Sequence, residues 1–160
     1  MKIRIIILMI STSFSLYVNA TPEYSNYWGG GIGISYSGIG LSYGVKTDRD
    51  IKFASIGCID YSSQYGATCG GGIGWTTTEL FPQKANHHGF GVYVGLIGSQ
   101  LEADNKLTID RKSVYGGSLG YHYFLNGIGA KGLTLGASVA YGSRKNDNDF
   151  LYNFSIGYIF

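Results

Sequence analysis

The chain ends in FLYNFSIGYIF, residues 150–160, and this stretch decides the fold. Large apolar or aromatic side chains fill every even position, whereas most odd positions carry small or polar ones. Because successive side chains of a β-strand point to opposite faces, this period of two indicates a strand with one bulky face. The stretch 133–141 repeats the pattern, with leucine, valine and tyrosine opposed to threonine, glycine and serine.

This asymmetry distinguishes two kinds of barrel. A soluble barrel turns its bulky apolar face inward, whereas a membrane barrel turns that face to lipid and keeps a polar lumen. Small side chains cannot fill a soluble core, so the sequence predicts an all-β fold, a closed antiparallel transmembrane β-barrel of about eight strands. Each candidate is near the roughly 9–11 residues that a tilted membrane strand needs. The candidates cover residues 27–36, 39–47, 51–60, 66–76, 88–98, 113–124, 132–142 and 150–160.

An even strand number places both termini on one side of the membrane, which is the periplasm for outer-membrane barrels. Outer connections are then expected near 37–38, 62–64, 99–112 and 143–149, and inner ones near 47–50, 77–87 and 125–131. Charged residues concentrate in these gaps, as burial in lipid requires. A mixed face pattern in the third and fourth candidates indicates a β-bulge.

The first twenty residues have the three parts of an export signal. Basic Lys2 and Arg4 precede the apolar run 5–16, and small residues lead to Ala20, after which we expect cleavage. The run is too short for a membrane anchor, which is the alternative. The predicted organisation is a cleaved signal peptide at 1–20 and a barrel domain at 21–160, exported to the outer membrane of a Gram-negative bacterium.

Charge and composition exclude one class of partner. Removing Lys2 and Arg4 from the twelve basic residues leaves ten, equal to the ten acidic residues, whereas nucleic-acid binders normally carry a basic patch. The 26 glycines and 14 tyrosines disfavour helix and suit curved strands. Glycine runs at 29–33 and 70–74 contain nucleotide-binding spacing, but no helix follows that would hold a phosphate.

The terminal strand resembles the C-terminal signature of outer-membrane proteins, with alternating hydrophobic residues and a final phenylalanine. With the signal peptide and strand count, the mature chain is similar to the small eight-stranded group of the OmpX, Ail and OmpA membrane-domain type. The resemblance is architectural and covers the whole mature chain. It implies that Phe154, Ile156, Tyr158 and Phe160 form an assembly signal for the barrel-assembly machinery.

Cys58 and Cys69 are the only cysteines, and they flank a predicted hairpin whose turn is centred near Ser63. This placement makes them direct cross-strand neighbours, close enough for a disulfide. An exported chain meets an oxidising periplasm, so we expect a bond. A pair of free thiols and a redox-active pair are the alternatives.

Three histidines raise the question of catalysis, because lipid A deacylases share this type of fold and use a His/Ser/Glu triad. The expected topology places His87, His88 and His122 at the periplasmic end, whereas such a triad works at the outer leaflet. A hydrogen-bonded histidine in the lumen is the simpler interpretation of His122. We therefore assign no catalytic residue, cofactor or metal.

Four cations lie in the expected outer connections and are candidate contacts to lipopolysaccharide phosphates: Arg111, Lys112, Arg144 and Lys145. The leading hypothesis is a monomeric integral outer-membrane protein with a structural or surface-interaction role and no open pore, in contact with lipid and lipopolysaccharide. The alternatives are a lipid-modifying enzyme and a narrow, porin-like channel for small solutes.

Overall fold

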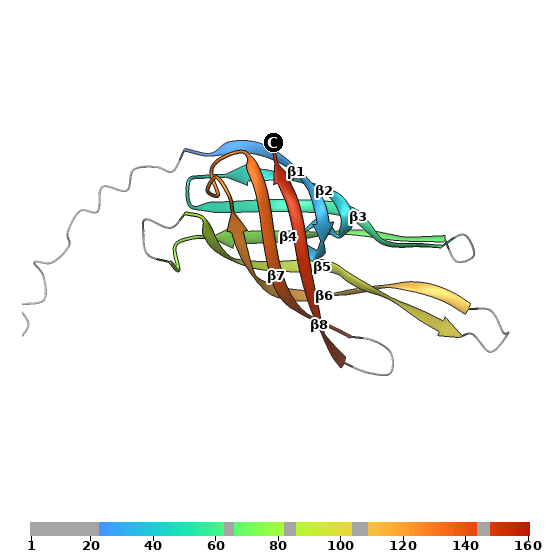
Figure 1. Cartoon of the computed structure of the whole chain (residues 1–160). Coiled ribbons are helices and arrows are strands. Elements are labelled where there is room, and N and C mark those ends of the chain that lie inside the picture. The colour runs from blue at the N-terminus through green and yellow to red at the C-terminus, as the bar shows by residue number, and fades with distance from the viewer. Residues whose placement is uncertain (1–22, 63–65, 82–85, 104–108, 144–147) are drawn as a thin grey trace, which may run out of the picture.

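The computed structural model describes residues 23–62, 66–81, 86–103, 109–143 and 148–160. These residues form a closed antiparallel barrel in which eight strands follow one another in sequence order (Figure 1). The predicted all-β, closed eight-stranded fold is therefore confirmed. The expected signal peptide, residues 1–20, lies outside the described part of the chain. The strands are β1 (Ser25–Gly33), β2 (Gly38–Lys46), β3 (Asp50–Ser62), β4 (Gly66–Thr77), β5 (His88–Ala103), β6 (Ile109–Phe124), β7 (Gly132–Ser143) and β8 (Asn148–Ile159).

The hairpin of β5 and β6 is longer than the sequence predicted. The two strands stay paired as far as Ala103 and Ile109, so the expected outer connection at 99–112 is wrong and shrinks to about 104–108. Residues 99–103 and 109–112 are mostly polar, which favours a loop in the sequence, yet they pair as strands. A bulge between Leu96 and Gly98 also disturbs the alternation there.

The outward surface carries the bulky apolar side chains. Tyr152 and Phe154 of β8 are 81% and 82% exposed, and every strand contributes at least one large apolar side chain to this surface. We call the outward apolar side chains of the strands the belt. Examples from each strand in turn are Trp28, Leu41, Ile56, Ile73, Val94, Leu119, Leu135 and Phe154.

The inward surface is mostly glycine, serine and threonine, with a few large side chains that fill the lumen. One buried cluster joins Tyr27, Ile51, Phe124, Ile128 and Ile159 at the end where the chain termini of the barrel lie. A second cluster lies farther along the barrel and contains Tyr93, Ile97, Val114 and Ala140 together with Ile34. Small inward residues thus make room for a limited number of rings.

Both ends of the barrel chain lie at the same rim, together with residues 47–49, 78–81, 86–87 and 125–131 of the connections (Figure 1). At this rim the amide of Phe160 donates to the carbonyl of Trp28, 2.8 Å away. The described ladder that closes the barrel pairs β1 with β8 at four positions, from Gly29 with Ile159 to Ile32 with Ile156. Among the described residues, no helix is long and apolar enough to cross a membrane.

Candidate functional site

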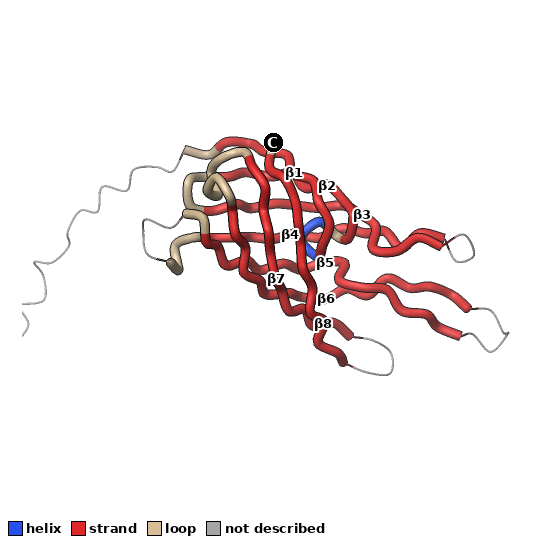
Figure 2. The backbone as a smooth tube through the Cα atoms, in the orientation of Figure 1, coloured by secondary structure: helices blue, strands red, loops and turns tan. Residues whose placement is uncertain are grey.

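The connection between β1 and β2 folds into the lumen instead of away from the barrel. It forms one 3-10 turn, η2 (Ile34–Tyr36), followed by Ser37, and Figure 2 shows this turn among the strands. Ser37 is fully buried, at 0% exposure, and η2 contacts β1 to β5 and β8. We call residues 34–37 the plug.

Hydrogen bonds tie the plug to the barrel wall on several sides. The hydroxyl of Ser37 lies 2.9 Å from the hydroxyls of both Ser55 on β3 and Tyr93 on β5. The Tyr36 hydroxyl lies 3.2 Å from Thr134 Oγ1 on β7. Because all of these groups are buried, leaving one of them without its partner would cost the full desolvation penalty of a polar atom.

An additional bond joins the start of the plug to the last strand. The backbone amide of Ile34 donates to Asn153 Oδ1 on β8, 3.2 Å away. This amide has left the ladder of β1, so a side chain takes the place of a neighbouring strand as its acceptor. The plug is therefore held by β3, β5, β7 and β8 together.

Glycines on the wall let the plug and its neighbours approach closely. The Tyr36 ring lies against Gly157 and Gly31, where an added Cβ would overlap the ring. Tyr93 lies in the same way against Gly72 and Gly95. The abundance of glycine in the strands thus has a packing cause, since each of these positions faces a flat ring inside a narrow barrel.

A small cavity of about 30 Å³ lies against Ser35 and Tyr36 of the plug and has room for no more than a few water molecules. Its lining includes His122, Ser155, Tyr27 and Thr134, and no lining residue is acidic. His122 also packs against Phe124, with ring centroids 6.3 Å apart. The lumen position predicted for His122 agrees with this arrangement.

The other two histidines lie at the rim that holds the termini. His87 Nδ1 is 2.7 Å from the carbonyl oxygen of Phe124, and His88 Nδ1 is 2.5 Å from the hydroxyl of Tyr121. Neither bond joins the histidine to a carboxylate or to a serine. In the described part of the chain, no three His, Cys, Asp or Glu side chains converge as metal ligands would.

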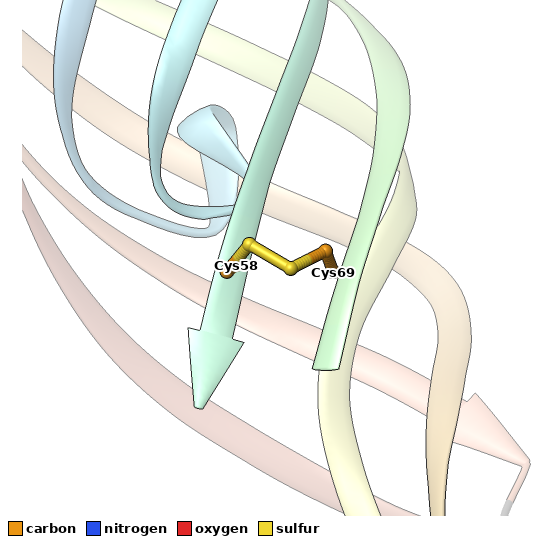
Figure 3. Close-up of a disulfide and its surroundings, with 2 residues drawn as sticks. All are labelled: Cys58 and Cys69. Atoms are coloured by element: carbon orange, nitrogen blue, oxygen red, sulfur yellow. A yellow bond between two sulfur atoms is a disulfide. The ribbon is translucent and has the colours of Figure 1, made fainter. Parts of the chain in front are cut away.

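Cys58 and Cys69 form the predicted disulfide (Figure 3). They are direct partners in the ladder of β3 and β4, with Cα atoms 3.9 Å apart, and a bulge follows between Cys58 and Asp60. Both the pairing and the bulge in the third strand are therefore confirmed. Cys58 also pairs with Ile39 at the last described position of the ladder of β2 with β3, so the bond joins β3 and β4 where their hairpin begins to extend beyond β2. Figure 1 shows this hairpin projecting from the barrel.

A salt bridge joins the two projecting hairpins. The described pairing of β4 with β5 ends at Gly72 and Gly95, and beyond that point the hairpins β3–β4 and β5–β6 separate (Figure 1). Arg111 on β6 reaches across to Asp60 on β3, with 2.7 Å between Nη1 and Oδ2. The arginine side chain is only 12% exposed and Asp60 is 41% exposed, so the ion pair is partly shielded from water.

The remaining predicted site residues lie at the barrel surface or outside the described residues. Phe154, Ile156, Tyr158 and Phe160 all point outward from β8 or its end. Lys112 is exposed next to Arg111, whereas Arg144 and Lys145 lie outside the described residues. Roles in assembly and in lipopolysaccharide binding stay predictions.

Comparison with known proteins gives no family assignment. No protein-family model matches the chain, and neither a curated protein nor a solved structure matches it significantly.

Proposed function

We propose that the chain is an integral outer-membrane protein with a closed lumen, serving a structural or surface-interaction role in the envelope of a Gram-negative bacterium. The outward belt carries this proposal. Water-soluble monomers rarely expose contiguous apolar patches beyond a few hundred Å². A closed barrel that is small and polar inside and bulky and apolar outside fits hydrocarbon as its surroundings.

The plug supports a role without conduction. Tyr36 and Ser37 are buried and bonded to side chains of β3, β5 and β7, and the nearby cavity has room for no more than a few water molecules. A continuous water path through the described lumen would require the plug to leave. The projecting hairpins, braced by the disulfide and by the Arg111–Asp60 pair, are then the part of the protein offered to partners outside the membrane.

A lipid-modifying activity is the alternative from the family resemblance, and the geometry offers it no support. A catalytic triad needs a nucleophile within hydrogen-bond reach of a base, and the base within reach of an acidic side chain. His122 shares its cavity with Ser155 but with no acidic side chain. We therefore propose no catalytic function.

The test is to refold residues 21–160 from urea into phospholipid vesicles and to compare two charged substitutions. Val139 lies in the belt on β7, so Val139→Arg should destabilise the inserted barrel by about 2–4 kcal/mol if the site faces the bilayer interior. Tyr61 points outward on the projecting hairpin, so Tyr61→Arg should change stability by less than about 0.5 kcal/mol.

Two further outcomes decide the proposal. Refolded protein should resist extraction from vesicles by alkaline carbonate and should give no conductance in planar bilayers. A compact monomer in detergent-free buffer, with equal effects of the two arginine substitutions, would overturn membrane insertion. Steady conductance from the intact protein would overturn the closed lumen.

A further inference from the structure

A hollow interrupts the belt at Gly117, at a middle position of β6. The ladders place Gly117 between Val94 of β5 and Tyr141 of β7, and Tyr141 is paired in turn with Phe150 of β8. All three neighbours point outward and are exposed. A Cβ added at Gly117 would meet only the carbonyl oxygen of Tyr93, 3.8 Å away. The space that other belt positions fill with a side chain is therefore open here.

The hollow is large enough for a ligand. Its volume is about 320 Å³, at the lower end of the range for small-molecule pockets. Valines and a leucine line it from β5, β6 and β7, and the paired rings of Tyr141 and Phe150, with centroids 5.4 Å apart, form one wall. The lining side chains that face outward are apolar except for one tyrosine hydroxyl.

Another outward glycine shows that the hollow does not follow from glycine alone. At Gly30 on β1, an added Cβ would lie 3.2 Å from Leu41 Cδ2 and 3.9 Å from Phe160 Cε2. Neighbouring side chains already cover that glycine. At Gly117 the neighbours leave the space uncovered, so the hollow is open to whatever surrounds the barrel.

We propose that this hollow binds one hydrocarbon chain of a membrane lipid, an inference that rests on the proposed membrane location. The apolar lining matches an acyl chain, and the hollow continues the same belt that would contact lipid. A polypeptide strand fits poorly, because β6 is paired on both sides at Gly117 and offers no free backbone hydrogen bonds. The width of a single missing side chain also suits a single narrow chain.

Tryptophan quenching by brominated phosphatidylcholine tests the proposal, because a bromine on the acyl chain quenches only a ring that it touches. The chain has two tryptophans, Trp28 and Trp75, both in the belt and outside the hollow. The first reporter carries Trp28→Phe, Trp75→Phe and Phe150→Trp, which puts the only indole in the wall of the hollow. The second carries Trp28→Phe alone and keeps Trp75 as the belt control.

Vesicles with increasing fractions of brominated lipid give an association constant for lipid at each reporter. We expect lipid to associate about threefold more tightly at the hollow than at Trp75, a difference of roughly 0.65 kcal/mol. Gly117→Leu fills the hollow and should remove that difference while leaving the Trp75 curve unchanged. Ala54→Leu, an equally outward substitution on β3, should leave both curves unchanged.

Each other outcome overturns a stated claim. Equal constants at the two reporters, unaffected by Gly117→Leu, would overturn the lipid site while leaving membrane insertion intact. No quenching at either reporter would overturn the proposed membrane location itself. If a higher protein-to-lipid ratio shields only the Phe150→Trp reporter, the occupant is a second copy of this chain and the lipid site is wrong.

Discussion

Replacing Gly157 with alanine tests whether the plug is packed against the wall as described. Gly157 lies on the inward face of β8, and the three atoms closest to an added Cβ all belong to Tyr36 of the plug. The Cβ would overlap Oη and Cζ and would lie 2.6 Å from Cε2. Tyr36 is itself buried, so its ring cannot move away without disturbing other contacts.

The expected loss has two parts. Overpacking a well-packed interior costs about 1–3 kcal/mol, and displacing the ring breaks the bond between Tyr36 and Thr134, which adds about 1 kcal/mol. Gly157→Ala should therefore lower the free energy of unfolding by about 2–4 kcal/mol. This loss leaves a barrel of ordinary stability, about 5–15 kcal/mol, still folded.

The assay is urea unfolding of refolded protein in detergent micelles, followed by tryptophan fluorescence. Gly117→Ala is the matched control, because the same methyl group there points outward into open space. The free energy of unfolding of that variant should differ from that of the parent by less than about 0.5 kcal/mol, or should be higher by up to about 1 kcal/mol. In a Tyr36→Ala background, Gly157→Ala should cost less than about 0.5 kcal/mol, since the ring it overlaps is gone. Equal losses at Gly157 and Gly117, or an undiminished loss without the ring, would refute the packing of the plug.

Two shorter predictions concern the disulfide and the end of the chain. Cys58→Ser with Cys69→Ser should lower the free energy of unfolding by at most about 2–3 kcal/mol, because the bond spans only 11 residues; a loss that persists when both proteins are measured in reductant would show that the bond is not its cause. Deleting Phe160 should lower the amount of protein in the outer-membrane fraction far more than Phe150→Ala at the other end of β8, and unchanged levels would contradict an assembly role.

The sequence predicts the strands well because each strand can be recognised from a short stretch of consecutive residues. Each strand separates bulky from small residues with a period of two, and this alternation is visible in the sequence before any strand pairing is known. The disulfide is also a local consequence, since one hairpin register brings Cys58 opposite Cys69. Such features need only neighbours in the sequence.

The plug could not be predicted, because its conformation depends on contacts with residues far away in the sequence. Residues 31–36 alternate glycine or serine with isoleucine and tyrosine, so they read as the end of a strand, and 27–36 was predicted as one. The chain leaves the sheet at Gly33, whose φ of 130° suits glycine, but glycines also occupy 29, 30 and 31. Nothing local shows which glycine turns. The partners of Ser37 and Tyr36 come from β3, β5 and β7, so the hydrogen-bonded site could not be predicted.

The pairing of β1 with β8, which closes the barrel, has a consequence for the order of folding. The first strand meets the last one, and the start of the plug binds Asn153, 119 residues away from Ile34. Contacts so distant in sequence form slowly, because the entropy of a long loop is lost before any contact is gained. Until β8 arrives, β1 has one unpaired edge and the plug lacks one of its acceptors. The addition of β8 to the sheet therefore completes the wall and the interior in the same step.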